Sequence, residues 1–268
     1  MNIIHWVPSG GKNPPWPMVN SWVNMEIPEG ASKRFVRSLP GSIEKYWNEA
    51  MIGFLKTGAE WLFSTHDDIQ FVPGTLKRLL SWDKPLVSAM VFMRHSPVLP
   101  HVWKAYDGKK DYLAQRINDT REWFYQHKEY IIFKPFIMEP CPEDALVNVG
   151  FSSTACVLIN RQVIKDIYDF VGPNWWAQDK EKGYGGEDRR FFQLAAIAGY
   201  DGFVDRSCVA GHTKGDIPSG VADFIAWDTV AAFMHTGEEY ENSKSLETAE
   251  ADGGMSDSDK HLCNTGRI

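Results

Sequence analysis

Two groups of side chains in the sequence are suited to catalysis. The first is His66-Asp67-Asp68, which follows the apolar run Trp61-Leu62-Phe63 directly. Carboxylate oxygens at the end of a rigid strand suit a hard divalent cation that keeps open positions for substrate phosphates. The alternative is an ordinary turn, because two aspartates shortly before Pro73-Gly74 are also common turn chemistry.

The second group is Gly185-Gly186-Glu187-Asp188, which precedes an amphipathic segment that runs to Ala198. If that segment is a helix, both acids lie in its first turn, where the helix dipole favours ionised carboxylates. An ionised carboxylate suits a general base. The alternative is that these acids only compensate the dipole. The two glycines permit a ligand to approach the backbone closely.

The elements that must hold these residues alternate between strand and helix patterns, which predicts an α/β sheet with helices packed on it. Ile3 to Val7 is an apolar run that predicts a first strand, ending in the loop Pro8-Ser9-Gly10-Gly11. We expect this loop to continue through Pro14, Pro15 and Pro17. Ser42 is positioned to cap a helix that keeps a 3.6-residue period to Leu55, with Gly58 after its end.

Further along the chain the same patterns continue. They predict a strand at 61–63, a short helix from Pro73-Gly74 to Leu80, a strand from Leu86 to Met93, a strand from Ala155 to Ile159 that leads through Asn160 into a helix to Phe170, a helix from Glu187 to Ala198, and a strand from Gly202 to Val204 followed by a loop to His212. Ligands of open α/β sheets bind outside the carboxyl ends of the strands. We therefore expect the polar clusters to meet in one crevice.

Composition supports a globular protein whose charge is concentrated in its tail. The chain has 268 residues, 43% hydrophobic and 24% charged, with a formal net charge of -7. Residues 237–268 contain eight acids and three basic residues, so the remainder is nearly neutral. A near-neutral body lacks the basic surface typical of nucleic-acid binding. We expect a single domain over residues 1–235 and an acidic peripheral or flexible tail over residues 236–268.

Membrane and export features are missing from the sequence. No apolar run approaches the length of about 18 to 20 residues that a membrane span needs, and the N-terminus lacks the pattern of a signal peptide. The four cysteines, Cys141, Cys156, Cys208 and Cys263, form no C-x-x-C pair. We expect a soluble protein in a reducing compartment, the cytoplasm, which would be that of the host if a phage encodes the chain.

Three stretches resemble the glycosyltransferases of the GT-A fold, especially compact bacterial and bacteriophage members related to glycosyltransferase family 2. They are EWLFSTHDDIQFVPGTLKRLL, KPLVSAMVFMR and GGEDRRFFQLAAIAGYDGFVDRSCVAGH. Such enzymes have an apolar strand before Asp-x-Asp or Asp-Asp-Asp, and later Glu-Asp-x-x-Phe, Gly-Tyr, Val-Asp and a histidine. The resemblance covers roughly residues 1–213. It implies one α/β domain of the GT-A, Rossmann-like type, with a mixed central sheet and helices on both faces.

The resemblance also implies roles for individual residues. Asp68 corresponds to the last acid of Asp-x-Asp and to a metal ligand, His212 to a further ligand, and Asp188, beside Glu187, to the catalytic base. Asp67 would lie near the nucleotide ribose or the metal. His66 stands where the first aspartate of the motif is expected. Because an imidazole binds borderline metals, we expect Mn²⁺ to suit this site better than Mg²⁺.

The resemblance suggests binding residues as well. By analogy, Pro8 and Ser9 contact the nucleotide of the donor. Arg94, at the end of a predicted strand, is placed to face a diphosphate or sugar, or else is an ordinary surface arginine. Trp175 and Trp176 are placed to stack on an acceptor sugar, although anchoring a loop in the core explains such a pair equally well.

Together these residues favour a metal-dependent glycosyltransferase that uses a nucleotide-diphosphate sugar, with UDP- or GDP-sugars expected, and transfers the sugar with inversion. Two alternatives stay open. One is a metal-dependent phosphohydrolase, in which His66-Asp67 is a metal-binding pair. The other is a glycan-binding module without catalysis. The acceptor is left open between a glycan, a protein, a lipid-linked sugar and a modified nucleobase.

Overall fold

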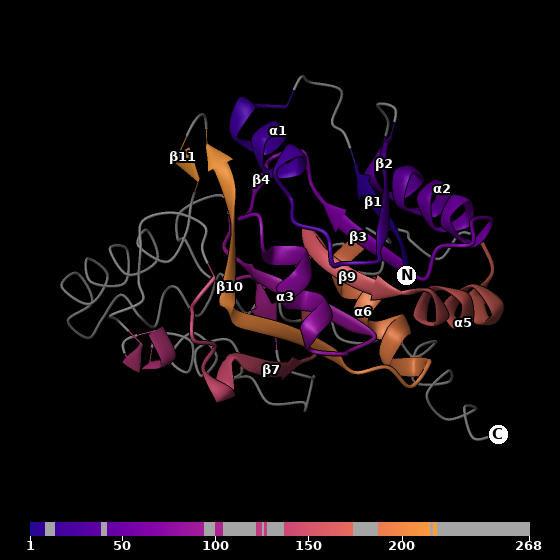
Figure 1. Ribbon diagram of the computed structural model, residues 1–268. Coiled ribbons are helices and arrows are strands. Elements are labelled where there is room, and N and C mark those ends of the chain that lie inside the picture. Colours follow the sequence, from indigo (N-terminus) through magenta and orange to yellow (C-terminus); the bar gives the residue numbers. More distant parts are fainter. Residues whose placement is uncertain are drawn as a thin grey trace.

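A mixed sheet forms the centre of the molecule, seen in the computed structural model of Figure 1. The structure describes residues 1–8, 14–38, 42–93, 100–103, 122–124, 126–127, 137–173, 187–214 and 217–218. The predicted domain end near residue 235 and the tail at 236–268 lie outside these residues.

The strands of the central sheet follow the order β11-β10-β5-β9-β3-β1-β2. Their bounds are β1 Asn2–Val7, β2 Ser32–Arg37, β3 Trp61–Thr65, β5 Leu86–Val91, β9 Cys156–Asn160, β10 Gly202–Lys214 and β11 Ile217–Pro218; β4 (Ile69–Gln70) and β7 (Leu146–Val149) also pair with β10. Strand β9 runs antiparallel to both of its neighbours, β3 and β5, whereas β1 is parallel to β2 and β3, and β5 is parallel to β10. Strands β1, β2, β3, β5 and β10 therefore point the same way.

Helices cover both faces of this sheet (Figure 1). Their bounds are α1 Trp16–Val23, α2 Ile43–Leu55, α3 Thr75–Ser81, α5 Arg161–Val171 and α6 Glu187–Ile197, and a 3-10 turn, η2, spans Glu143–Ala145. Apolar side chains of α2, α5 and α6 pack on one face, and those of α1 and α3 pack on the other. Successive strand residues alternate between the two cores: Leu62 belongs to the first and Phe63 to the second. The α/β class with a mixed central sheet, which the sequence predicts, is confirmed.

Local sequence explains where several helices begin and end. The hydroxyl of Ser42 accepts the backbone N–H of Lys45 at the start of α2, and the Asn160 side chain accepts that of Gln162 at the start of α5. These caps satisfy N–H groups that have no partner within the helix. Gly172 and Gly199 follow α5 and α6 with φ of 80° and 89°, a conformation that ends helices and favours glycine.

The structure corrects the loop predicted through Pro14, Pro15 and Pro17. Helix α1 begins at Trp16 and has Pro17 in its first turn. Proline fits there because the first N–H groups of a helix need no partner inside it and because the ring fixes a helical φ. The prolines therefore mark the start of a helix.

The structure also corrects the loop predicted between Val204 and His212, because β10 runs on to Lys214. Asp205 is paired with Ala89 of β5, but the next pair is Val209 with Met90. Three residues of β10, 206–208, thus bulge out of the ladder. A bulge breaks the alternation by which a strand is recognised in a sequence.

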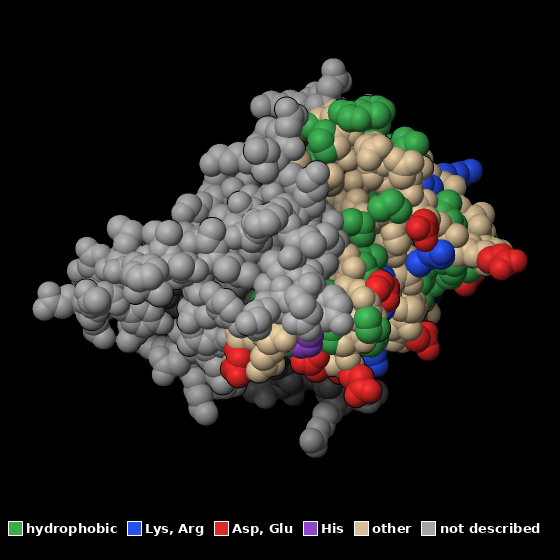
Figure 2. All heavy atoms as spheres, turned by 60° about the vertical axis from the view of Figure 1, so that its left-hand side comes forward, with side chains coloured by type: hydrophobic (Ala, Val, Ile, Leu, Met, Phe, Trp, Pro, Cys, Tyr) green, Lys and Arg blue, Asp and Glu red, His purple; other side chains and the backbone are tan. Residues whose placement is uncertain are grey.

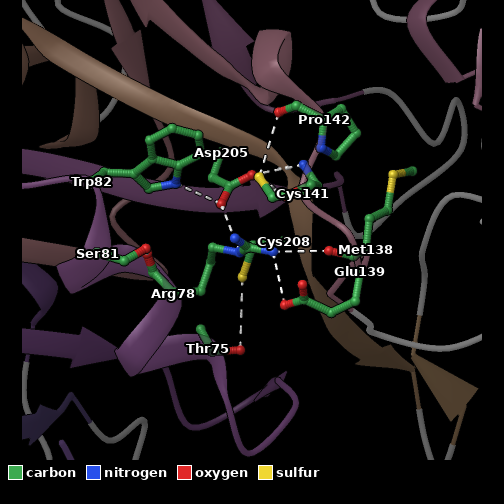
Figure 3. A network of polar contacts seen from close by, with 11 residues as sticks. Thr75, Arg78, Ser81, Trp82, Met138, Glu139, Cys141, Pro142, Asp205 and Cys208 are labelled. Carbon is green, nitrogen blue, oxygen red and sulfur yellow. Dashed lines mark hydrogen bonds and ion pairs between the residues drawn. The ribbon is translucent and has the colours of Figure 1, made fainter.

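Buried polar contacts fix this bulge to α3 (Figure 3). The carboxylate of Asp205, fully buried, accepts hydrogen bonds from Trp82 Nε1 at 2.8 Å and from the backbone N–H of Ser207 at 2.8 Å. Arg78 Nε lies 3.7 Å from the same carboxylate, and Arg78 Nη2 donates to the carbonyl oxygen of Met138 at 2.8 Å. The buried charge is therefore compensated and hydrogen-bonded, as burial requires.

Strand β2 is the edge strand next to β1, and its pattern explains why the sequence does not reveal it. It carries Lys33, Arg34 and Arg37, and most of its residues are exposed. Charged residues on an edge strand discourage pairing with other chains, at the cost of the apolar alternation that identifies a strand.

The described surface has mixed character. On the face that Figure 2 shows, acidic, basic and hydrophobic side chains are interspersed over the described part, without a continuous basic surface there. Of the helices within the described ranges, none has the length and hydropathy to cross a membrane.

Candidate active site

The carboxyl ends of the five co-directional strands lie at one edge of the sheet. Strand β3 ends at Thr65 and continues into His66-Asp67-Asp68. Strand β9 runs in the opposite direction, so its first residues, preceded by Ser153-Thr154-Ala155, lie at the same edge. We call this tripeptide the 153–155 segment. It connects the parts of the chain that carry the candidate residues.

Each residue of the 153–155 segment makes a different connection. The backbone N–H of Ser153 donates to the carbonyl oxygen of His101 at 3.1 Å. The Thr154 hydroxyl donates to Oδ1 of Asp188. The Ala155 carbonyl accepts the backbone N–H of His66 at 2.9 Å. The segment therefore holds the end of β3, the residue His101 and the start of α6 together.

Asp188 lies in the first turn of α6, as the sequence predicts. Its side chain is only 12% exposed, and its second oxygen, Oδ2, is 3.9 Å from Nδ1 of His101. The helix N-terminus favours negative charge at this position. Asp188 is thus a nearly buried carboxylate that the Thr154 hydroxyl holds in place, with the His101 imidazole close to its second oxygen. Helix α6 begins at Glu187, whose side chain lies outside the described part.

Asp68 and His212 are brought together by the pairing of β4 with β10. Ile69 is the register partner of His212, and the backbone N–H of Thr213 donates to the carbonyl oxygen of Asp68 at 2.8 Å. The Thr213 hydroxyl donates to the same oxygen at 3.2 Å. Asp68 is therefore next to His212 at the sheet edge, although the two are far apart in the sequence.

The imidazole of His212 has a defined tautomer when it is neutral. Its Nδ1 lies 2.8 Å from the carbonyl oxygen of Phe92, which only accepts, so Nδ1 carries the proton and Nε2 carries the lone pair. Metal-binding histidines are usually held in this way, with one nitrogen donating to a carbonyl. Phe92 follows β5, and the backbone N–H of His101 donates to the neighbouring Val91 carbonyl at 2.8 Å. His101 and His212 are thus both fixed to the end of β5.

His66 is partly buried, and its Nε2 is buried without a hydrogen-bond partner in the part of the chain that the structure describes. Several other buried polar atoms, Ser64 Oγ among them, share this property within the described residues, so it does not mark His66 as a metal ligand. Within the same part of the chain, no three or more His, Cys, Asp or Glu side chains are grouped so as to hold a metal ion. The metal role of His66, Asp68 and His212 stays a prediction.

The charge of Asp67 affects the pKa of Tyr46, a residue that the sequence does not single out. Tyr46 of α2 is buried, and burial together with the negative charge of Asp67 raises the pKa of its phenol. Its hydroxyl oxygen has no hydrogen-bond partner among the described residues. The phenol is therefore a neutral donor beside the acidic cluster. In the sequence Tyr46 is only one more apolar position of a helix.

His5 lies beneath the same edge and is fully buried. Its Nε2 is 2.8 Å from the hydroxyl oxygen of Thr65, the last residue of β3. Burial, and to a smaller extent the charge of Lys33, lowers the pKa of His5 to about 3. His5 is therefore neutral at ordinary pH, and its contact with Thr65 stabilises the end of β3.

The remaining predicted site residues separate into two groups. Pro8 is buried directly after β1, at the edge where the candidate residues lie. Ser9, Arg94, Trp175 and Trp176 lie outside the described residues. His101 and Thr154 belong to the site, yet neither stands in a recognisable motif, and only the long-range contacts reveal them.

A cavity lies beside α2. It has a volume of about 330 Å³ and lies between α2 and strands β1 and β2, lined by Ile4, Leu62, Gly53 and Phe54 among others. Ile4 and Leu62 are central residues of their strands. The lining also includes Trp6, Ser38 and Tyr46, and Trp6 is paired with Ser64 near the end of β3. The cavity therefore extends from the middle of the sheet toward the edge where Asp67 lies.

Comparison with known proteins finds similarity among solved structures and none in sequence. The sequence matches no known family and no curated protein. Among solved structures, the chain is similar to A197 from STIV, with 12% sequence identity and a TM-score of 0.45, over 80% of this chain and 86% of that one.

Proposed function

We propose that this protein is a metal-dependent glycosyltransferase that moves a sugar from a nucleotide-diphosphate sugar, a UDP- or GDP-sugar, to an acceptor hydroxyl with inversion. The observation that carries the proposal is the pairing of Ile69 with His212. It supports the proposal because the backbone segments that carry Asp68 and His212 meet at the edge where Thr154 contacts Asp188.

Asp68 and His212 would hold the divalent metal, Mn²⁺ or Mg²⁺. The Nδ1 contact with the Phe92 carbonyl orients the His212 ring as in metal-binding histidines. The metal supplies positive charge that stabilises the leaving diphosphate. Asp68 and His212 alone would bind a divalent cation weakly, and the phosphates of the donor would add the oxygen ligands that such cations prefer. We therefore expect tight metal binding only when the nucleotide is present.

Asp188 acts as the general base. It takes the proton of the acceptor hydroxyl as the oxygen attacks the anomeric carbon, and the bond from that carbon to the diphosphate breaks, with its electron pair leaving on the diphosphate. Thr154 fixes one carboxylate oxygen, so the second, on the side of His101, is the one directed to the acceptor. Restricted exposure limits competition from water.

A thermal-shift panel tests the proposal. The panel combines UDP-, GDP-, dTDP- and CDP-sugars, each with Mn²⁺ and with EDTA. We expect one nucleotide series to raise the melting temperature with Mn²⁺ only, and expect Asp68→Ala to abolish the shift. No shift with any nucleotide contradicts the proposal. Release of phosphate from free nucleotides without an acceptor supports the phosphohydrolase instead.

A further inference from the structure

A short two-stranded sheet lies beside Asp188. Strands β6 (Val102–Trp103) and β8 (Phe151–Ser152) pair antiparallel, with Trp103 opposite Phe151 and Val102 opposite Ser152. Because side chains alternate along a strand, the two pairs face opposite sides of this small sheet. The Val102 and Ser152 side chains are buried, whereas Trp103 and Phe151 are partly exposed.

One side belongs to the protein core. Val102 is buried in the same core as α2, α5 and α6. Ser152 is fully buried, and its hydroxyl oxygen lies 2.8 Å from that of Ser88 on β5. The small sheet is therefore fixed to the central sheet by packing and by a buried hydrogen bond, which gives the opposite side a defined position.

The opposite side carries a stacked aromatic pair. The rings of Trp103 and Phe151 are nearly parallel, with an interplanar angle of 10° and centroids 5.0 Å apart. Both residues are partly exposed, and Phe151 also packs against the core that contains Val102. His101 precedes this strand, and its ring contacts Phe151 edge-on at 6.4 Å between centroids. The Nδ1 atom of His101 is the one 3.9 Å from Asp188. The stacked pair and the carboxylate are thus connected through a single imidazole.

This combination has a specific chemistry. Because the two rings stack on each other, the faces they share are occupied, and the outer face of the pair is the surface that can pack against a ligand. An outer ring face packs against the C–H face of a pyranose, which is the apolar side of an otherwise hydroxyl-rich molecule. A carboxylate and an imidazole beside it accept and donate hydrogen bonds to the hydroxyls at the ring edge. The carboxylate of Asp188 repels the phosphates of a nucleic acid backbone. A neutral sugar therefore suits the surface better than a nucleobase within a polynucleotide.

We propose that Trp103 and Phe151 form the platform on which a pyranose of the acceptor binds, with one of its hydroxyls directed to Asp188. The acceptor is accordingly a glycan or another glycoside. The role of Asp188 in this inference rests on the proposed function, but the binding of sugar to the platform does not. The two can therefore fail separately.

The test measures glycoside binding without catalysis. Methyl glycosides of glucose, galactose, mannose and N-acetylglucosamine, and thymidine as a comparison, are titrated into the full-length protein and followed by saturation-transfer NMR. We expect one glycoside series to bind. We expect Phe151→Leu and Trp103→Ala to weaken that binding by about tenfold or more, and Trp103→Phe to retain most of it because a ring remains.

Two controls separate the possible outcomes. Phe170→Leu on α5, where the phenylalanine is 52% exposed, removes a surface ring elsewhere and is expected to leave binding unchanged. The nucleotide-dependent thermal shift with Mn²⁺ shows whether each variant is folded and binds donor. Loss of glycoside binding in Phe151→Leu with that shift intact supports the platform.

Other results overturn it. Glycoside binding that survives Phe151→Leu and Trp103→Ala, binding of thymidine alone, or an absence of glycoside binding by the unmodified protein each contradicts the platform. Glycoside binding that depends on Trp103 in a protein without any nucleotide-dependent shift instead retains the platform and contradicts the glycosyltransferase.

Discussion

The Thr154 hydroxyl donates a hydrogen bond to the Asp188 carboxylate, joining the residues before β9 to the first turn of α6. Both residues are buried. A buried carboxylate needs such partners, since an uncompensated charge away from water is costly. The contact therefore serves stability, and it also fixes which carboxylate oxygen is turned toward His101.

Replacing Asp188 by Asn is expected to lower the transfer rate by about 10² to 10⁴-fold, because an amide cannot accept the acceptor's proton. The change preserves size and permits the Thr154 contact. Donor binding, measured as the Mn²⁺-dependent thermal shift with the nucleotide sugar, should persist. Transfer at the unmodified rate by Asp188→Asn would remove the base assignment.

Replacing Thr154 by Val is expected to remove a buried hydrogen bond to the Asp188 carboxylate. Because a hydrogen bond to a charged group contributes about 1.5–3 kcal/mol, we expect the free energy of unfolding to fall by up to that amount. The transfer rate should fall as well, since the carboxylate loses its orientation. Thr154→Ser retains the hydroxyl and should restore both. Equal rates and stabilities for the Val and Ser variants would contradict this role.

The lowered pKa of His5 predicts that the free energy of unfolding depends on pH. Its pKa is lowered to about 3 in the folded protein, from 6.5. Between these values the unfolded chain binds the proton and the folded chain does not, so lowering the pH through this window favours unfolding. One such group contributes at most about 1.4 kcal/mol per pH unit. Urea unfolding of the unmodified protein and of His5→Gln, at pH 7, 6, 5 and 4, measures it.

The His5→Gln variant is the control as well as the test. Glutamine carries both a donor and an acceptor that can serve Thr65, and it does not titrate in this range. We expect the unfolding free energy of the variant to decrease less steeply with falling pH. Parallel slopes for the two proteins would show that His5 takes up its proton in the folded state.

Replacing glycine by alanine is expected to have opposite effects on stability at Gly202 and at Gly53. A Cβ at Gly202 would lie 2.7 Å from two ring carbons of Phe192, which is buried in the core. Gly202→Ala should therefore destabilise the protein by about 1–3 kcal/mol through overpacking. A Cβ at Gly53, inside α2, meets nothing within 4 Å. Gly53→Ala should stabilise by about 0.4–1 kcal/mol, because alanine loses less conformational entropy in a helix.

Denaturant unfolding of the two alanine variants under identical conditions compares them directly. A Gly202→Ala protein as stable as the unmodified one would mean that Phe192 has room to move. A destabilised Gly53→Ala protein would mean that α2 packs more closely than the structure shows.

The sequence predicts those parts of the fold that local patterns determine. The cap residue Ser42, the period of α2 and the apolar run of β3 are complete within about a dozen residues each, and the structure has them where we expect them. Strand β2 and the second half of β10 are not determined locally. The first is held by pairing with β1, and the second is interrupted by its bulge.

The candidate site shows the same division. Asp68, Asp188 and His212 are found from motifs because their neighbours along the chain are distinctive. Thr154 and His101 have ordinary neighbours, and their place follows only from contacts with residues far away in the sequence. The contact between the residues before β9 and the start of α6 cannot be predicted from the spacing of residues in a single sequence.

The bulge at residues 206–208 reverses which face of the sheet each later residue of β10 serves. Val204 lies in the core with α6, and so does Val209, whereas Cys208 and Ala210 lie in the core with α3. In an uninterrupted strand, Val204 and Cys208 would share a face. The number of residues between Asp205 and Val209 therefore determines toward which face of the sheet each later side chain of β10 points, and His212 is one of these. Deleting one of residues 206–208, with the rest of β10 in regular alternation, would turn His212 to the opposite face of the sheet.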